Sequence, residues 1–203
     1  IEYRKTNTPL FLYRSTNPII PKEGSYDYEI YVFHPTEDAV KSGNEQDKPN
    51  FMSYLILLKY GNYKAVFGGD VIEDHWKEIW ELTKNDKKAK ELFSGVHTFK
   101  ASHHGRNSGR CGKEMLNLMN PEYVIISVGK KDEKNDATEW YRKRPDGSSR
   151  NVWTTRWRGT IWIETDGESE PVAMSRYDRK DTKNHIEKLN IPFLSDTPYY
   201  VKL

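Results

Sequence analysis

The order of apolar segments through the middle of the chain constrains its fold more than any other feature. Apolar, β-rich runs lie at 52–70, 95–102 and 122–129, and helical patterns at 71–82 and 111–120 separate them. Strands joined through helices pair in parallel, and their crossovers are nearly always right-handed. The sequence therefore predicts an α/β domain whose parallel strands end at one common edge, where open sheets of this class bind ligands.

Further elements are expected on either side of this block. The run 28–35 predicts a strand that Pro35 ends, and the polar residues 36–50 predict a loop. The run 52–70 predicts a hairpin that turns at Gly61-Asn62. Two more strands around a turn are expected at 151–155 and 159–165.

The two predicted helices each have an apolar face. Within 71–82, residues at three- and four-residue steps form that face, namely Ile72, Trp76, Ile79 and Trp80. Within 111–120, the inward side chains are expected to be Met115, Leu116 and Met119. Cys111, the only cysteine, is expected to be packed rather than reactive.

Composition argues against a membrane-spanning helix and against a fold held by disulfides. Charged residues make up 31% of the 203 residues, and no apolar run approaches the roughly 20 residues that a membrane helix needs. A single cysteine forms no internal disulfide, which favours a cytoplasmic location. The sequence starts at Ile1 rather than Met, so we expect further N-terminal sequence.

Two motifs follow predicted strands and carry chemically active side chains. "VFGGD" at 66–70 ends in Asp70, and "KASHHGRNSG" at 100–109 contains His103 and His104. Because parallel strands end at one edge, the two motifs are expected to converge. A carboxylate and neutral imidazoles are ligands for a divalent metal, and a second imidazole can act as general acid.

Each motif also has a simpler explanation. A strand that ends in Gly-Gly-Asp often marks only a turn with an Asx cap. A histidine near a strand end is often structural or solvated. His34, His75 and His185 are interpreted in this way, with His75 and His185 on the surface.

Five blocks, in order, resemble the metallo-β-lactamase superfamily, and most closely the hydrolase domain of ComEC-like DNA-internalisation competence proteins. They are "NFMSYLILLKYG", "FGGD", "FKASHHGRNSG", "PEYVIISVG" and "VWTT…GTIWI", and the match runs from Tyr28 to Glu164. The resemblance implies an αβ/βα sandwich, of which this chain is the C-terminal part. It also implies one or two Zn²⁺ or Mn²⁺ ions and phosphodiester substrates.

The resemblance also implies roles for individual residues. Asp70 and His103 match metal ligands, and His104 is the expected catalytic residue nearer the substrate. The predicted substrate-binding residues flank this centre in sequence and are Lys100, Arg106, Ser108 and Arg110.

Two departures from the family pattern matter. The His-x-His-x-Asp-His block that supplies most ligands is not present in this sequence. A later Tyr-Gly-His-Pro block is replaced by "KKDEKNDATEW" at 130–140, where Asp132 and Asp136 are possible substitutes and a solvated loop is the alternative. We therefore expect an N-terminal segment or a partner chain to complete the site.

The segment 140–158 combines six basic residues with three tryptophans and a tyrosine, a composition that favours nucleic-acid contact. Base stacking is expected from Trp153 or Trp157. The leading hypothesis is a metal-dependent phosphodiesterase or nuclease that acts on DNA or RNA. The alternatives are a catalytically incomplete module that binds nucleic acid or scaffolds a complex, and a metallohydrolase for a small ester or lactam.

The expected organisation has three parts. Residues 1–27 form a lead-in segment, 28–176 form the metallo-β-lactamase-like part, and 177–203 form a charged C-terminal extension.

Overall fold

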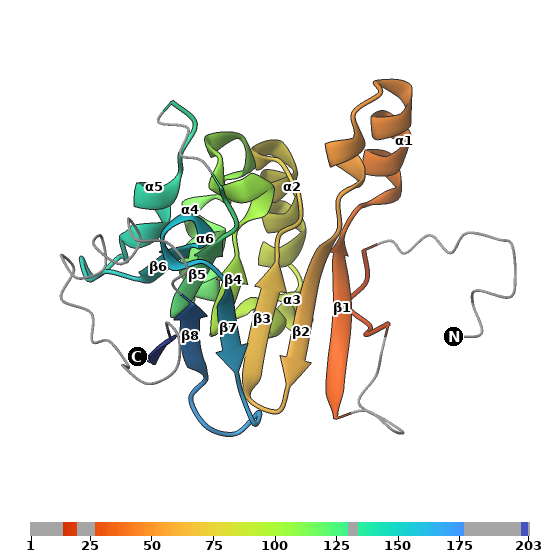
Figure 1. Cartoon of the computed structure of the whole chain (residues 1–203). Helices are drawn as coiled ribbons and strands as arrows, with labels where there is room; N and C mark the ends of the chain where they lie inside the picture. Colours follow the sequence, from red (N-terminus) through yellow and green to blue (C-terminus); the bar gives the residue numbers. More distant parts are fainter. Residues whose placement is uncertain (1–13, 20–26, 130–133, 177–199, 203) are drawn as a thin grey trace, which may run out of the picture.

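The computed structural model describes residues 14–19, 27–129, 134–176 and 200–202. The predicted lead-in segment and C-terminal extension therefore lie largely outside the described residues, as do Asp132 and His185. Within the described residues, the chain has an α/β fold with one large mixed sheet and one small sheet (Figure 1).

Six strands form the large sheet in the same order as in the sequence: β1 (Tyr28–His34), β2 (Leu55–Tyr60), β3 (Tyr63–Phe67), β4 (Thr98–Lys100), β5 (Tyr123–Ile126) and β6 (Asn151–Thr154). Strands β1, β2 and β3 pair antiparallel, and β3 through β6 pair in parallel. The predicted hairpin and the predicted parallel block are confirmed. Since β1 runs in the same direction as β3, five of the six strands end at one edge.

The helices connect these strands and are α1 (Glu37–Glu45), α2 (Glu73–Lys84), α3 (Lys87–Phe93), α4 (Lys113–Met119), α5 (Thr138–Arg142) and α6 (Thr155–Arg158). Helices α2 and α4 confirm the two predicted helices. Of their expected inward residues, five are buried: Trp76, Ile79, Met115, Leu116 and Met119. Trp80 is partly buried against the core, and Ile72 is the N-cap of α2. Cys111 is buried as expected.

The predicted loop at 36–50 is wrong, because α1 and a short 3₁₀ segment (Pro49–Met52) occupy most of it. The Thr36 hydroxyl caps α1 by accepting from the Ala39 amide, and acidic residues fill its first turn. The helix buries only Ala39 and Gly43. A helix with so small an apolar face has no clear hydrophobic period.

The small sheet has the order β7 (Ile161–Glu164), β8 (Val172–Arg176) and β9 (Tyr200–Lys202). Two strands were expected around a turn near 151–165, and both exist as β6 and β7. They do not pair with each other, because α6 lies between them and β7 pairs with β8. Side chains of the two sheets meet in a small core that includes Tyr123, Ile125, Trp153 and Ala173.

The two faces of the large sheet differ. Helices α2, α3 and α4 pack on one face over the main core, which contains Phe33, Leu57 and Phe99 (Figure 1). On the opposite face, side chains alternate with these core residues. Over β1–β3 that face carries an apolar set, which we call the apolar face: Tyr28, Ile30, Ile56, Leu58, Tyr60 and Phe67.

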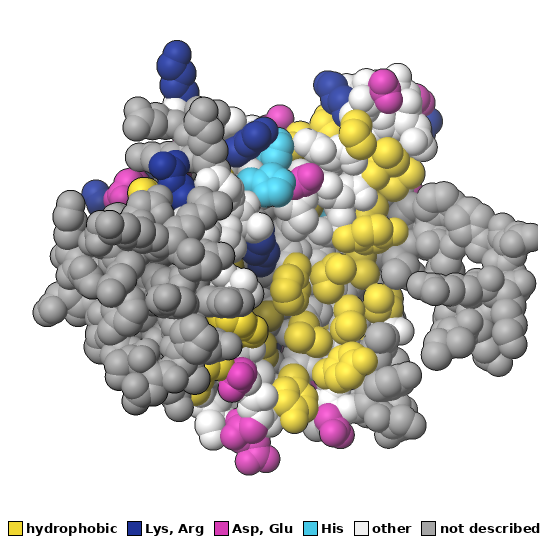
Figure 2. All heavy atoms as spheres, viewed as in Figure 1, with side chains coloured by type: hydrophobic (Ala, Val, Ile, Leu, Met, Phe, Trp, Pro, Cys, Tyr) yellow, Lys and Arg dark blue, Asp and Glu magenta, His cyan; other side chains and the backbone are white. Residues whose placement is uncertain are grey.

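The apolar face is accessible. Phe67 is 44% exposed, and the other members are partly exposed. Figure 2 shows hydrophobic side chains spread over this part of the molecule, below a group of histidine and acidic side chains. No helix within the described residues is long and apolar enough to span a membrane.

Candidate metal centre

The predicted motifs meet at the edge where the parallel strands end. Asp70 follows β3 after Gly68 and Gly69, and His103 and His104 lie in a 3₁₀ segment (Ser102–Gly105) that follows β4. The backbone joins the two motifs, because the His103 amide donates to the Gly69 carbonyl at 2.8 Å.

Asp70 and His104 face each other directly. His104 Nε2 lies 3.8 Å from Asp70 Oδ1, and both side chains are about half exposed. His104 Nδ1 lies 2.8 Å from the Ser127 carbonyl at the end of β5. A carbonyl only accepts, so Nδ1 carries the proton, and in the neutral ring Nε2 keeps its lone pair beside the carboxylate.

The other histidine of the motif, His103, contacts Ser108. Its Nδ1 lies 3.2 Å from the Ser108 hydroxyl. Burial lowers the pKa of His103, and the Asp70 carboxylate opposes that shift, while Arg106 and His104 lower the pKa further. Asp70 therefore lies close to His104 and acts electrostatically on His103, and burial favours the neutral, ligand-competent form of His103.

The backbone of the histidine pair is strained. His103 and His104 both have left-handed backbone angles, with φ of 47° and 57°. This conformation costs a non-glycine residue about 1–2 kcal/mol, and such strain concentrates at functional sites. Two adjacent histidines in this conformation are therefore a feature that an ordinary loop would avoid.

Tight packing beneath the turn holds it in place. Ser102 is fully buried, and its hydroxyl accepts a hydrogen bond from Trp76 Nε1 at 3.0 Å. A side chain at Gly68 would meet the Ser102 side chain and would lie 2.9 Å from the Ser102 backbone nitrogen. Gly68 is thus required by the close approach of the end of β3 to the turn at Ser102–Gly105.

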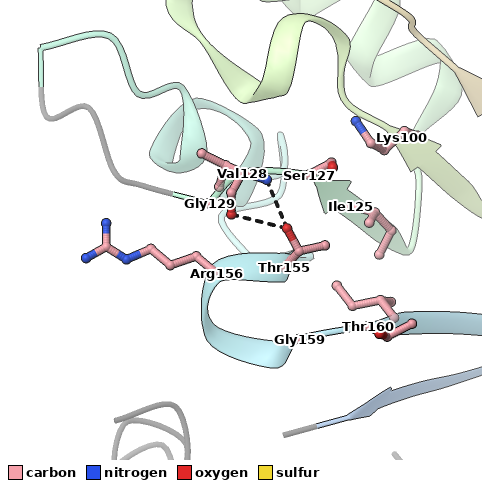
Figure 3. A pocket seen from close by; sticks show the side chains of 10 residues that line it. Lys100, Ile125, Ser127, Val128, Gly129, Thr155, Arg156, Gly159 and Thr160 are labelled. Atoms are coloured by element: carbon pink, nitrogen blue, oxygen red, sulfur yellow. Dashed lines mark hydrogen bonds between the residues drawn. The ribbon is translucent and has the colours of Figure 1, made fainter. Parts of the chain in front are cut away.

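A pocket of about 580 Å³ lies next to the contact between His104 and Ser127. It is lined in part by Lys100, Ser127, Thr155 and Arg156. Figure 3 shows the Thr155 hydroxyl holding the Val128 backbone, with Lys100 and Arg156 on opposite sides of the pocket. Burial lowers the pKa of Lys100, and Asp70 opposes this shift. Lys100 and Arg156 line the pocket, and its lining residue Ser127 contacts His104, whereas Asp70 and the two histidines lie outside the lining.

The other predicted substrate-binding residues lie in different surroundings. Arg106 is exposed at the end of the histidine turn, and Ser108 contacts His103. Arg110 pairs with Glu73 at 3.3 Å and stacks over Trp140. Arg110 is thus already held by partners of its own.

The basic, aromatic segment 140–158 is only partly available to a ligand. Trp153 is 2% exposed and lies under the Arg158 guanidinium, so the expectation that Trp153 stacks on bases is wrong. Arg150 and Arg158 are also buried. Arg158 joins the two sheets through Trp153 and the Ser175 hydroxyl, whereas Arg150 donates to the carbonyls of Tyr141 and Lys143. Trp157 remains partly exposed.

The structure changes the interpretation of two further residues, His75 and Asp136. His75 is 9% exposed rather than on the surface, and it lies against the buried His34. The sequence signal that places His75 and Glu78 together is their spacing, since residues three apart share a helix face. Asp136 accepts from the Thr138 amide at 2.7 Å as α5 begins, which gives it a local structural role.

Comparison of the chain with protein-family models and with curated proteins finds no match.

Proposed function

We propose that this chain forms the C-terminal part of a metallo-β-lactamase-type hydrolase, and that the complete protein is a metal-dependent phosphodiesterase acting on nucleic acid. The observation that carries the proposal is the line from Asp70 to His104 to the Ser127 carbonyl, beside a pocket with Lys100 and Arg156. The order of the five sequence blocks supports the αβ/βα sandwich.

The donor set fits a divalent ion. Asp70 offers a carboxylate oxygen, and the two imidazoles offer nitrogen, which together suit Zn²⁺ or Mn²⁺. A bound ion would supply a water acidic enough to attack a phosphodiester near pH 7. In the proposed arrangement Asp70 and one histidine hold the ion, and the other histidine donates a proton to the leaving oxygen.

The sequence resemblance and the geometry favour different histidines as the metal ligand. The sequence resemblance assigns the metal to His103 and proton transfer to His104. The 3.8 Å separation between His104 and Asp70 supports His104 as a ligand, and the Ser127 carbonyl orients its ring as the outer partner of a metal-binding histidine does. Lys100 and Arg156 would neutralise phosphate charge in the pocket.

The proposal includes a segment or partner chain that supplies the remaining ligands. One carboxylate and two imidazoles are fewer donors than a tight centre with one or two ions requires. The apolar face over β1–β3 supports this part of the proposal, because partly exposed apolar side chains gathered on one face are typical of a contact with another surface. A covering β-sheet would also complete the sandwich.

The activity test compares the complete protein with the 203-residue chain. The complete protein should hydrolyse bis(p-nitrophenyl) phosphate and a single-stranded oligonucleotide with Mn²⁺ or Zn²⁺, and a chelator should abolish both reactions. The chain alone should bind metal weakly and hydrolyse neither, because ligands are missing. Robust cleavage by the chain alone would show that the site lies elsewhere.

The substrate class is tested by charge reversal at two exposed basic residues, Arg106 and Lys143. For a single strand, each lost phosphate contact should reduce the salt dependence of binding by about 0.7 in log-log slope. Reversal of both to Glu should lower the slope by about 1.4 and, near 0.1 M salt, the affinity by roughly 25-fold. Filter binding across a salt series measures both quantities.

Lys87→Glu with Lys90→Glu is the matched control, because it changes net charge by the same amount on exposed positions of α3. This pair should leave the slope nearly unchanged. Equal effects of the two double variants, or binding that does not respond to salt, would favour a small-molecule substrate over nucleic acid.

A further inference from the structure

A second group of possible metal ligands lies at the same sheet edge and shares no residue with the Asp70 centre. His34 ends β1, and His75 and Glu78 lie one turn apart on α2. One ligand atom from each of the three residues lies within 4.8 Å of the other two. The two imidazole rings are 4.6 Å apart between centroids.

Two buried nitrogens in this cluster have no hydrogen-bond partner. They are His34 Nε2 and His75 Nδ1. His34 is fully buried and His75 is 9% exposed, so water compensates little for the missing partners. Buried polar atoms nearly always have partners, so two unpartnered nitrogens on neighbouring imidazole rings point to a ligand that binds both residues.

The outer contacts of the cluster resemble those of a metal site. His34 Nδ1 lies 2.6 Å from the Ser53 carbonyl, so it carries the proton and leaves the Nε2 lone pair free to ligate. The Thr36 hydroxyl donates to Glu78 Oε1 at 3.2 Å. Metal-binding histidines and carboxylates are held by such partners, which fix the ring tautomer and the carboxylate orientation.

The charges around the cluster also favour a cation. Glu78 and Asp74 both act electrostatically on His75 and raise its pKa, although burial lowers that pKa overall. Burial lowers the pKa of His34 to about 4, so its imidazole is neutral near pH 7. The cluster therefore combines two neutral imidazoles with nearby negative charge.

We propose that His34, His75 and Glu78 form a second divalent-metal site, suited to Zn²⁺, that joins the end of β1 to helix α2. Two nitrogens and one carboxylate oxygen form a donor set typical of zinc sites that keep a fourth position for water. Bonds of about 2.0–2.2 Å require the donors to approach more closely than 4.8 Å, so binding would require rotation of these side chains. Glu78 is partly exposed and provides the entry route.

The site has a structural role in this proposal. Thr36 precedes α1, and Ser53 follows the 3₁₀ segment that comes after α1. The Phe51 ring of that segment packs edge-on against His75. A bound ion would thus fix α1, the end of β1 and the start of α2 relative to one another. An ion that binds only the folded state raises its stability, so Zn²⁺ should raise the melting temperature.

The test uses the full chain carrying Asp70→Asn, so that the first centre contributes little. After removal of metal by a chelator, Co²⁺ should give the visible absorption of a tetrahedral complex, and Zn²⁺ should displace it and raise the melting temperature. Adding Glu78→Gln, which keeps the side-chain shape, should weaken Co²⁺ binding at least tenfold and abolish the Zn²⁺-induced rise. Adding Glu81→Gln instead, an exposed change on the same helix, should preserve both.

A second measurement makes no change within the cluster. In the Asp70→Asn chain, Zn²⁺ should shift the ring signals of His34 and His75 in NMR spectra and leave that of His97 in place. Unchanged His34 and His75 signals at saturating Zn²⁺ would overturn the proposal. Identical metal responses of the Glu78→Gln and Glu81→Gln chains would overturn it as well.

Discussion

Asp70→Asn should lower metal-dependent phosphodiester hydrolysis by the complete protein more than about 100-fold. Loss of an outer partner of a metal ligand costs about 10–100-fold in metal affinity or activity, and loss of a direct ligand should cost more. The amide keeps the shape of the side chain but lacks the negative charge that holds the cation. Steady-state rates with bis(p-nitrophenyl) phosphate at several Mn²⁺ concentrations measure the loss.

The fold should survive this change, because the Asp70 side chain is 45% exposed and lies at the end of a turn. Asp38→Asn, at an exposed position in the first turn of α1, is the control and should retain full activity. Activity of the Asp70→Asn protein within a few-fold of the original would remove Asp70 from the metal centre. In that case the hydrolytic site lies elsewhere, whereas absence of hydrolysis by the unmodified complete protein would favour a catalytically incomplete module that binds nucleic acid.

Gly105→Ala should destabilise the fold by about 2–4 kcal/mol, because it combines two penalties. Gly105 has a φ of 71°, and an added Cβ would lie 2.7 Å from Ile126 Cγ2. Ile126 is buried in β5 and has little room to move. Urea denaturation gives the change in the free energy of unfolding.

Gly95→Ala separates the two penalties. Gly95 has a similar φ of 64°, but nothing lies within 4 Å of an added Cβ. It should therefore cost only the backbone penalty of about 1–2 kcal/mol. Equal losses from the two variants would show that contact between the histidine turn and β5 does not hold that turn in place.

The sequence predicts the parallel part of the fold because its strands and helices have strong, separate apolar periods. Trp76 and Ile79 identify the buried face of α2, and the run that becomes β5 is almost wholly apolar. Helix α1 is missed because it buries so little apolar surface, and α3 because its seven residues contain three lysines. Strand β7 pairs with β8 across a loop that contains the turn residues Asp166 and Gly167, whereas the run at 159–165 was expected to pair with 151–155.

The candidate site also has features that strand direction predicts and features that depend on packing. The convergence of Asp70 with the histidine pair follows from strand direction alone. The left-handed backbone of His103 and His104 does not, because it depends on packing of the turn against neighbouring strands. The burial of Trp153 and His75 likewise depends on which side chains lie opposite them, so both were placed wrongly from the sequence.

The most direct test of the metal centre is paramagnetic broadening by Mn²⁺ in the Glu78→Gln chain, where the second cluster is disabled. Mn²⁺ should broaden the ring signals of His103 and His104 first and leave that of His97 sharp, and Asp70→Asn should remove the effect. Sharp His103 and His104 signals at high Mn²⁺, or equal broadening with and without Asp70, would contradict it.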